Sequence, residues 1–243
     1  MRIDRFMQIR KIFGFTLSEA LISLTIVGVV AALVVPIVLR DTMNKARITN
    51  LKSTVAQLNE AIQIEIEKTG ATSLRDTNII RETDAFFKRL DYAKVSSDEE
   101  DIYGEGFKYK NLQNGTEMAV PSMNEYAKLK NGVIVGIRVA NSNNTYKYHT
   151  VYIDANGLKG PNVFGVDMFA LYLVDQNYKR TDNSASQNEI IEHIGDLGCI
   201  ASQVNNYYTT QNSSHCKASN TDAKRLTCYC RLERSGFDPN YMN

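Results

Sequence analysis

The feature that most constrains this chain is an uncharged apolar run near the N-terminus, Ala20–Leu39. As a helix, its 20 residues would be about 30 Å long, which matches the hydrocarbon core of a bilayer. A single acid, Glu19, comes directly before the run. A carboxylate held at bilayer depth costs about 2.5–3.5 kcal/mol, so it usually has a partner. The run therefore predicts a membrane-spanning helix, and Glu19 needs an explanation of its own.

Residues 1–14, ahead of the run, carry four basic side chains and one acid. A basic flank orients such a chain with its N-terminus in the cytoplasm. A secretory signal peptide has an apolar core of about 7–15 residues, which is shorter than this one. A plain membrane anchor explains the length and the flank but leaves Glu19 without a role.

The stretch "GFTLSE", residues 14–19, resembles the cleavage and methylation motif of type IV prepilins and type II secretion pseudopilins. The resemblance implies that a prepilin peptidase cuts between Gly14 and Phe15 and then N-methylates Phe15. Glu19 becomes the fifth mature residue, where the family has its characteristic acid. Gly28 and Pro36 fall at familiar positions of the pilin helix.

In the resembled family, Glu19 of one subunit pairs with the free amine of Phe15 on a neighbouring subunit. Such a pair neutralises two charges that would be costly alone in an apolar filament core. Pro36 is expected to kink the helix and Gly28 to add local flexibility. The competing interpretations are a tolerated interfacial acid at Glu19 and ordinary membrane-helix residues at Gly28 and Pro36.

The resemblance implies a structural subunit of a type IV pilus or type II secretion pseudopilus, assembled through its N-terminal helix. The implied partners are copies of itself, other pilins or pseudopilins, the prepilin peptidase, the inner-membrane assembly platform with its ATPase, and membrane lipid before assembly. The chain would cross the bacterial inner membrane once, with a periplasmic or extracellular head, and join the filament after assembly. Alternatives are a minor or competence-type pilin with an adhesion or DNA-uptake role, and a membrane-anchored periplasmic binding domain.

Charge and histidine content argue against two other classes of function. The formal net charge is +1, and loss of residues 1–14 would change it to −2, so neither form favours a nucleic-acid partner. The histidines at 149, 193 and 215 lie in no catalytic or metal motif. We therefore expect a protein that is not an enzyme.

Apolar residues spaced by three and four continue the helical pattern beyond the membrane-spanning run. They are Ile48, Leu51, Val55, Leu58, Ile62 and Ile66. Gly70 is a suitable stop. The prediction is a basic leader over 1–14, a membrane or filament-core helix over 15–39, its amphipathic continuation over 40–70, and a head domain over 71–243.

Three runs in the head domain, residues 132–140, 145–155 and 167–175, are rich in β-branched and aromatic residues and predict strands. A hairpin connection is expected at 141–144, short helices near 84–92 and 187–198, and an acidic loop at 95–107. The fold class is α+β. We expect a pilin-like lollipop, in which a long N-terminal helix packs on a small antiparallel sheet and the C-terminal region is stapled by disulfides.

The loop from Asp154 to Asp167 offers oxygen ligands that Ca²⁺ prefers, from Asp154, Asn156 and Asp167 with the Leu158 carbonyl. It lacks the full twelve-residue acid pattern and its terminal Glu. Asp and Asn before Gly also form ordinary turns. We expect a structural turn and no cofactor, with calcium as the alternative.

Four cysteines lie late in the chain, at Cys199, Cys216, Cys228 and Cys230, which predicts disulfides in an oxidising compartment. If residues 226–232 form a strand, Cys228 and Cys230 share a face with Cα atoms about 6.5–7 Å apart, too far for an easy mutual bond. Two pairings stay open: 199–228 with 216–230, or 199–230 with 216–228.

Overall fold

The structure is a computed structural model that describes residues 16–82, 86–110, 115–140, 148–180, 190–199, 216 and 227–239. The chain divides into two compact units, residues 1–43 and 44–243. Helix α1, Leu17–Thr69, begins in the first unit and ends in the second. It ends where predicted, because Gly70 adopts a φ of 62° and its N–H still donates to the Ile66 carbonyl at 2.8 Å.

The described part of the first unit is the N-terminal half of α1, and every residue from 16 to 43 is exposed. Its large apolar side chains from Leu17 to Leu39 are between 47% and 80% exposed. By length and composition α1 can cross a membrane, and none of its most apolar window is buried. Within the part of the chain that the structure describes, this half of the helix therefore packs against no protein core.

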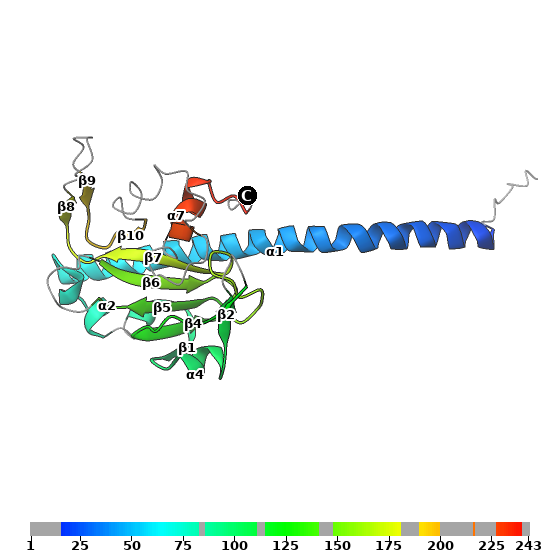
Figure 1. Ribbon diagram of the computed structural model, residues 1–243. Coiled ribbons are helices and arrows are strands. Elements are labelled where there is room, and N and C mark those ends of the chain that lie inside the picture. The colour runs from blue at the N-terminus through cyan, green and yellow to red at the C-terminus, as the bar shows by residue number, and fades with distance from the viewer. Residues whose placement is uncertain are drawn as a thin grey trace, which may run out of the picture. The chain divides into compact units, whose positions relative to one another are not determined.

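The second unit is built on a six-stranded antiparallel sheet of order β1-β4-β5-β6-β7-β10 (Figure 1). The strands are Tyr92–Ser96 (β1), Glu125–Leu129 (β4), Ile134–Arg138 (β5), Tyr148–Asp154 (β6), Met168–Val174 (β7) and Leu197–Gly198 (β10). Two small antiparallel pairs accompany it: Lys108–Lys110 (β2) with Glu117–Ala119 (β3), and Tyr178–Arg180 (β8) with Ile190–Glu192 (β9).

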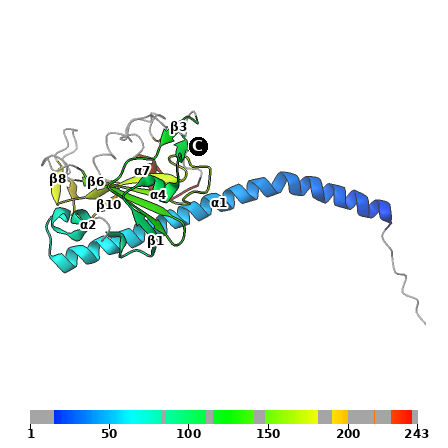
Figure 2. The same ribbon diagram turned by 90° about the horizontal axis from the view of Figure 1, so that it is seen from below.

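One face of the sheet packs against the C-terminal half of α1, which runs beside the strands in Figure 2. Leu51, Leu58 and Ile62 of α1 are fully buried in this core cluster. The helix α7, Thr227–Arg234, and the short helix α2, Asn78–Arg81, belong to the same unit. The helical spacing in the sequence thus correctly predicted which face of α1 is buried.

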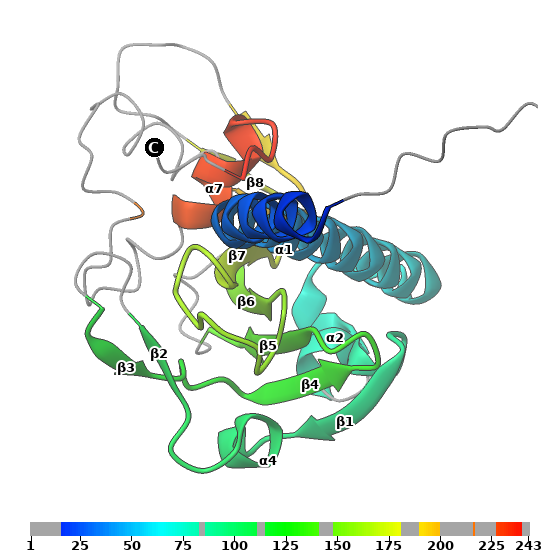
Figure 3. The ribbon, with the colours of Figure 1, turned by 90° about the vertical axis from the view of Figure 1, so that its right-hand side faces the viewer.

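The opposite face of the sheet is covered as well, by an aromatic cluster that includes Tyr103, Tyr109, Tyr126 and Tyr152. Tyr103 comes from helix α4, Glu99–Tyr103, and Tyr109 comes from β2. α2 and the β2–β3 pair lie on opposite sides of the sheet (Figure 3). Because both faces are covered, every residue of β7 is buried, which explains its continuous apolar sequence.

The predicted α+β class, the long helix and the three predicted strands are confirmed by α1, β5, β6 and β7. Three predictions of local structure were wrong. Residues 187–198 contain β9 and β10 in their described part, where a helix was expected. Cys228 and Cys230 lie on α7, where a strand was considered, and the acidic loop at 95–107 contains α4.

α4 begins with a helix cap, and this cap explains why the segment predicted to be an acidic loop contains a helix. The Asp98 side chain accepts a hydrogen bond from the Glu100 N–H at 3.0 Å. Three acidic side chains occupy the first turn, where they interact favourably with the positive end of the helix dipole. Near 84–92, the side chains of Phe86, Phe87 and Leu90 are buried as expected, although Asp84 lies outside the described residues. The hairpin connection at 141–144 lies outside them too.

Candidate functional site

The N-terminus of α1 is closed by a reciprocal cap between Thr16 and Glu19. The Glu19 N–H donates to the Thr16 hydroxyl at 3.3 Å. In return, the Glu19 carboxylate accepts hydrogen bonds from the Thr16 N–H at 2.9 Å and from its hydroxyl at 2.8 Å. This is a capping box, which satisfies backbone donors that the first turn of a helix leaves free. Within a single chain, Glu19 therefore has a structural use that the sequence reasoning overlooked, although the Thr-x-x-Glu spacing was its signal.

The other residues of the predicted processing and assembly site are placed only in part. Gly14 and Phe15 lie outside the described residues. Gly28 lies in the exposed half of α1, and no heavy atom would meet a side chain added there within 4 Å. Pro36 lies inside the same helix, where every neighbouring residue is exposed. Glu19, Gly28 and Pro36 thus lie on the same helix, but they do not line a common pocket.

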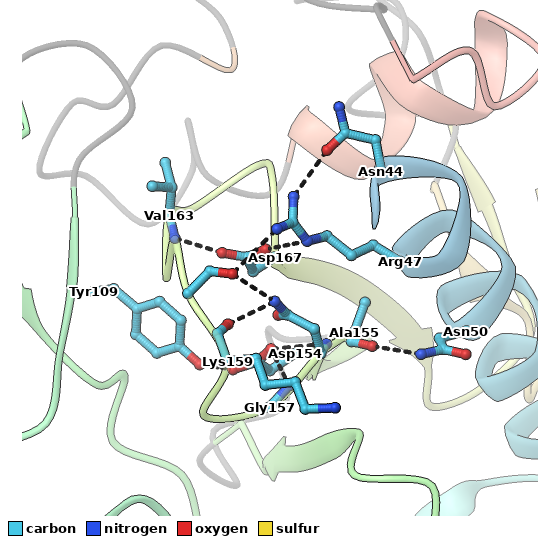
Figure 4. Close-up of polar contacts among 12 residues, drawn as sticks. Asn44, Arg47, Asn50, Tyr109, Asp154, Ala155, Gly157, Lys159, Val163 and Asp167 are labelled. Atoms are coloured by element: carbon cyan, nitrogen blue, oxygen red, sulfur yellow. Dashed lines mark hydrogen bonds and ion pairs between the residues drawn. The ribbon is translucent and has the colours of Figure 1, made fainter. Parts of the chain in front are cut away.

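The second candidate site is the loop between β6 and β7, which Arg47 reaches from α1 (Figure 4). The Arg47 Nε atom lies 3.0 Å from Oδ1 of Asp167, and the two side chains are only 9% and 0% exposed. The remaining guanidinium nitrogens donate to the Gly160 carbonyl at 3.1 Å and to the Asn44 side chain at 2.9 Å. One internal cation therefore joins the helix to two points of the loop.

Burial raises the pKa of Asp167, and the Arg47 guanidinium and the Val163 N–H both act against that rise. The Val163 N–H donates to the second carboxylate oxygen of Asp167 at 3.0 Å. A buried carboxylate needs such partners, because the desolvation penalty of an isolated charge is several kcal/mol. The positive charge beside Asp167 is thus supplied by Arg47, a side chain of the same chain.

Asp154, at the other end of the loop, holds a tight turn. Its carboxylate accepts hydrogen bonds from the N–H groups of Asn156, at 3.2 Å, and Gly157, at 2.8 Å, and from the Tyr109 hydroxyl. Burial raises the pKa of Asp154 to about 7, although these three hydrogen bonds act against the rise. This is an Asx-type turn of the kind that Asp before Gly forms.

The Asn156 side chain links two further points of the same loop. Its amide donates to the carbonyls of Lys159, at 2.6 Å, and Gly160, at 3.2 Å. The Asn50 side chain of α1 donates to the Ala155 carbonyl at 3.0 Å. Within the described residues, no group of three or more His, Cys, Asp or Glu side chains is arranged to hold a metal. The three suggested calcium ligands lie in one loop. The carboxylates of Asp154 and Asp167 have internal partners, whereas the buried Oδ1 atom of Asn156 has no hydrogen-bond partner among the described residues.

Comparison with known proteins bears on the N-terminal segment alone. A model of the prokaryotic N-terminal methylation motif matches residues 9–35. This match, together with the long apolar N-terminal helix, is consistent with a type IV pilin-like protein. The match includes Gly14, Phe15, Glu19 and Gly28, and it ends one residue before Pro36. No curated protein and no solved structure matches the chain.

Disulfides join Cys199 to Cys230 and Cys216 to Cys228, with Cα atoms 5.3 and 4.6 Å apart. This is one of the two pairings that the sequence left open. The expectation that Cys228 and Cys230 lie on a strand was wrong, because residues 227–234 form the helix α7. Two residues apart on α7, Cys228 and Cys230 point to different sides of the helix and so reach different partners.

The functional residue that the sequence analysis missed is Arg47. It occupies a position on the buried face of α1, one turn before Leu51, where an arginine is unusual. That placement was a usable signal of an internal ion pair. Its partner could not be identified from the sequence, because Asp167 lies in a loop far along the chain.

Proposed function

We propose that this chain is a structural subunit of a filament that assembles from the bacterial inner membrane, either a type IV pilus or a type II secretion pseudopilus. One observation carries the proposal. The methylation motif covers the beginning of a helix whose large apolar side chains, from Leu17 to Leu39, are all exposed. Exposed apolar surface on this scale requires cover, which lipid provides before assembly and other helices provide afterwards.

In this proposal a prepilin peptidase removes residues 1–14 and methylates Phe15. An assembly platform and its ATPase, both other chains, then extract the subunit from the membrane. The head, residues 71–243, faces outward on the periplasmic or extracellular side. The chain works mechanically, as part of a polymer, and we propose for it neither an enzymatic activity nor a metal cofactor.

Glu19 would change partners during assembly. Before assembly its carboxylate closes the cap with Thr16, as in the single chain. In the filament it would pair with the methylated amine of Phe15 on a neighbouring subunit. Such a pair removes two charges from an apolar core, where an unpaired charge is costly, and so fixes the axial position of one subunit against the next.

The capping box provides a sharp test, because glutamine closes the same cap without the charge. In the Glu19→Gln variant, we expect normal membrane insertion and helix formation but little or no incorporation into sheared filaments. Incorporation is measured by sedimentation and immunoblotting of cells that make the assembly machinery. The matched control is Thr16→Ala, which weakens the cap by about 1 kcal/mol but keeps the charge, and which should assemble.

A purified membrane protein whose mass and N-terminal sequence still include residues 1–14 would contradict the proposed function. Normal incorporation of Glu19→Gln would contradict the pairing role of Glu19 alone, because its carboxylate would then be only a helix cap.

A further inference from the structure

The loop between β6 and β7 lies at the end of the second unit where α1 enters it. The Asn50 side chain of α1 donates to the Ala155 carbonyl at 3.0 Å. Arg47, one turn earlier on α1, donates to the Gly160 carbonyl and also contacts Asn44, the first residue of the unit. From Ala155 to Gly160 the loop therefore advances along α1 toward the start of the unit.

This end of the second unit follows the predicted membrane span closely in sequence. The apolar run ends at Leu39, and Asn44 comes five positions later in the same helix. At 1.5 Å per residue these positions correspond to about 8 Å, which is close to the depth of the headgroup region on one side of a bilayer. A surface at this end of the unit is therefore within reach of lipid headgroups.

The tip of the loop combines an apolar and a basic side chain. Leu158 is 43% exposed, and Lys159 beside it is exposed as well. The acids of the loop, Asp154 and Asp167, are fully buried and have partners inside the chain. Such a tip suits a membrane interface, where the leucine enters the boundary of the acyl chains and the ammonium group stays among the headgroups.

Two further lysines add positive charge at this end of the unit. Lys110 of β2 is attached to the loop by its backbone, which donates to the Asn162 carbonyl at 2.7 Å and accepts from the Phe164 N–H at 3.2 Å. Lys45 lies on the first turn of α1 within the unit, and both lysine side chains are exposed. Within the described residues, Lys45, Lys110 and Lys159 form no ion pair.

We propose that Lys45, Lys110, Leu158 and Lys159 form a surface by which the second unit binds the anionic headgroups of the membrane that holds the chain. The three lysines supply charge complementary to lipid phosphates, and the leucine supplies apolar contact. Arg47 fixes the loop to α1 and so keeps its tip at this end of the unit. The surface acts in the membrane-bound stage of the proposed function and does not depend on filament assembly.

Fluorescence quenching by the lipid measures this contact in the full chain. All four cysteines are in disulfides, so a thiol-reactive fluorophore attaches only to an introduced cysteine. Leu158→Cys carries the apolar label at the loop tip. The matched control is Ile191→Cys, because Ile191 is 48% exposed and lies on β9, at the opposite end of the unit from β2 (Figure 1). Each labelled chain is reconstituted into vesicles that contain a lipid with a quencher on its headgroup.

Vesicle composition and lysine variants then identify the ligand. We expect quenching of the label at position 158 to be about twofold stronger with phosphatidylglycerol present than in phosphatidylcholine alone, and high salt should remove the difference. The triple variant Lys45→Gln, Lys110→Gln and Lys159→Gln should remove it too, because each lysine near an anionic surface changes the contact equilibrium about fivefold. Lys68→Gln, at the exposed far end of α1, is the matched control for Lys159→Gln and should leave the quenching unchanged.

The triple variant should keep the wild-type urea midpoint, because all three lysines are exposed. Equal quenching at positions 158 and 191 would overturn the proposal, since the loop tip would then not contact lipid. Equal quenching at position 158 in both kinds of vesicle, or in the triple variant, would overturn it as well, since anionic headgroups would then not be recognised. These readouts need neither leader cleavage nor filaments, so their failure is distinct from failure of the proposed function.

Discussion

Loss of the Arg47 guanidinium should strongly lower the free energy of unfolding of the second unit, residues 44–243. Its ion pair with Asp167 is buried on both sides, at 9% and 0% exposure. Removing one partner of a buried pair leaves an uncompensated charge and costs about 3–5 kcal/mol. The Gly160 carbonyl would lose its charged donor as well, so we expect Arg47→Ala at the upper end of this range.

The assay is urea unfolding of the detergent-solubilised full chain, followed by tyrosine fluorescence and near-UV circular dichroism, because the chain has 13 tyrosines and no tryptophan. The matched controls are Asp167→Asn and the double variant Arg47→Met with Asp167→Asn. The double variant should be more stable than Arg47→Ala, because neither charge is then left alone. A free energy of unfolding for Arg47→Ala within about 1 kcal/mol of wild type would refute the reasoning.

The pH dependence of the same variant gives an independent check. Burial raises the pKa of Asp167, and Arg47 opposes the rise, so Arg47→Ala should raise this pKa further. The folded variant then binds its proton more tightly than the unfolded chain does. By linkage, its deficit in unfolding free energy should shrink as the pH is lowered toward the pKa of Asp167 and grow toward neutral pH. A deficit independent of pH would mean that the loss comes from packing alone.

The remaining predictions concern the loop and its neighbours. Because burial raises the pKa of Asp154 to about 7 from 3.8, its contribution to stability should fall as the pH rises through that interval, and Asp154→Asn should flatten the pH profile of the urea midpoint. Calcium should leave the wild-type midpoint equal to that in chelator, since a guanidinium already lies beside Asp167; a rise with Ca²⁺ would contradict this. Gly157 has a φ of 61°, and a Cβ there would lie 2.2 Å from the Gly132 carbonyl oxygen. Gly157→Ala should therefore lower the urea midpoint more than Gly132→Ala, where φ is 90° but the space is open. For Gly157→Ala we expect the free energy of unfolding to fall by about 1–2 kcal/mol.

The sheet could be predicted only where its strands are buried on both sides. β7 has a continuous apolar sequence, and β5 and β6 are rich in β-branched and aromatic residues, because the helix covers one face of the sheet and the aromatic cluster covers the other. A helix was expected at 187–198, and the isoleucines at 190, 191 and 194 do repeat at helical spacing. In the fold β9 pairs with β8 and β10 pairs with β7, and these tertiary contacts override the local pattern.

The loop between β6 and β7 shows what single-segment patterns leave out. Asp154, Asn156 and Asp167 have the residue types of a calcium loop and of a turn alike. What distinguishes the two is the cation beside Asp167, and here that cation comes from Arg47, 113 residues before the Gly160 carbonyl that it also contacts. Sequence separation of this size hides the partner, whereas the unusual position of Arg47 on an apolar helix face was visible from the start.

The two halves of α1 were predictable for opposite physical reasons, and their difference bears on function. From Leu51 to Ile62, apolar residues occupy one face and are buried by the sheet, so the chain itself supplies their partners. From Leu17 to Leu39, apolar residues occupy every face, and all of the large ones are exposed. A helix that is apolar all round is covered by lipid or by other protein, and the first turn of this one holds a carboxylate that closes its own cap. Within the residues that the structure describes, that carboxylate has a partner and the apolar surface has none. Under the proposed function, assembly would cover this surface, and Glu19 would have to release Thr16 at the same step.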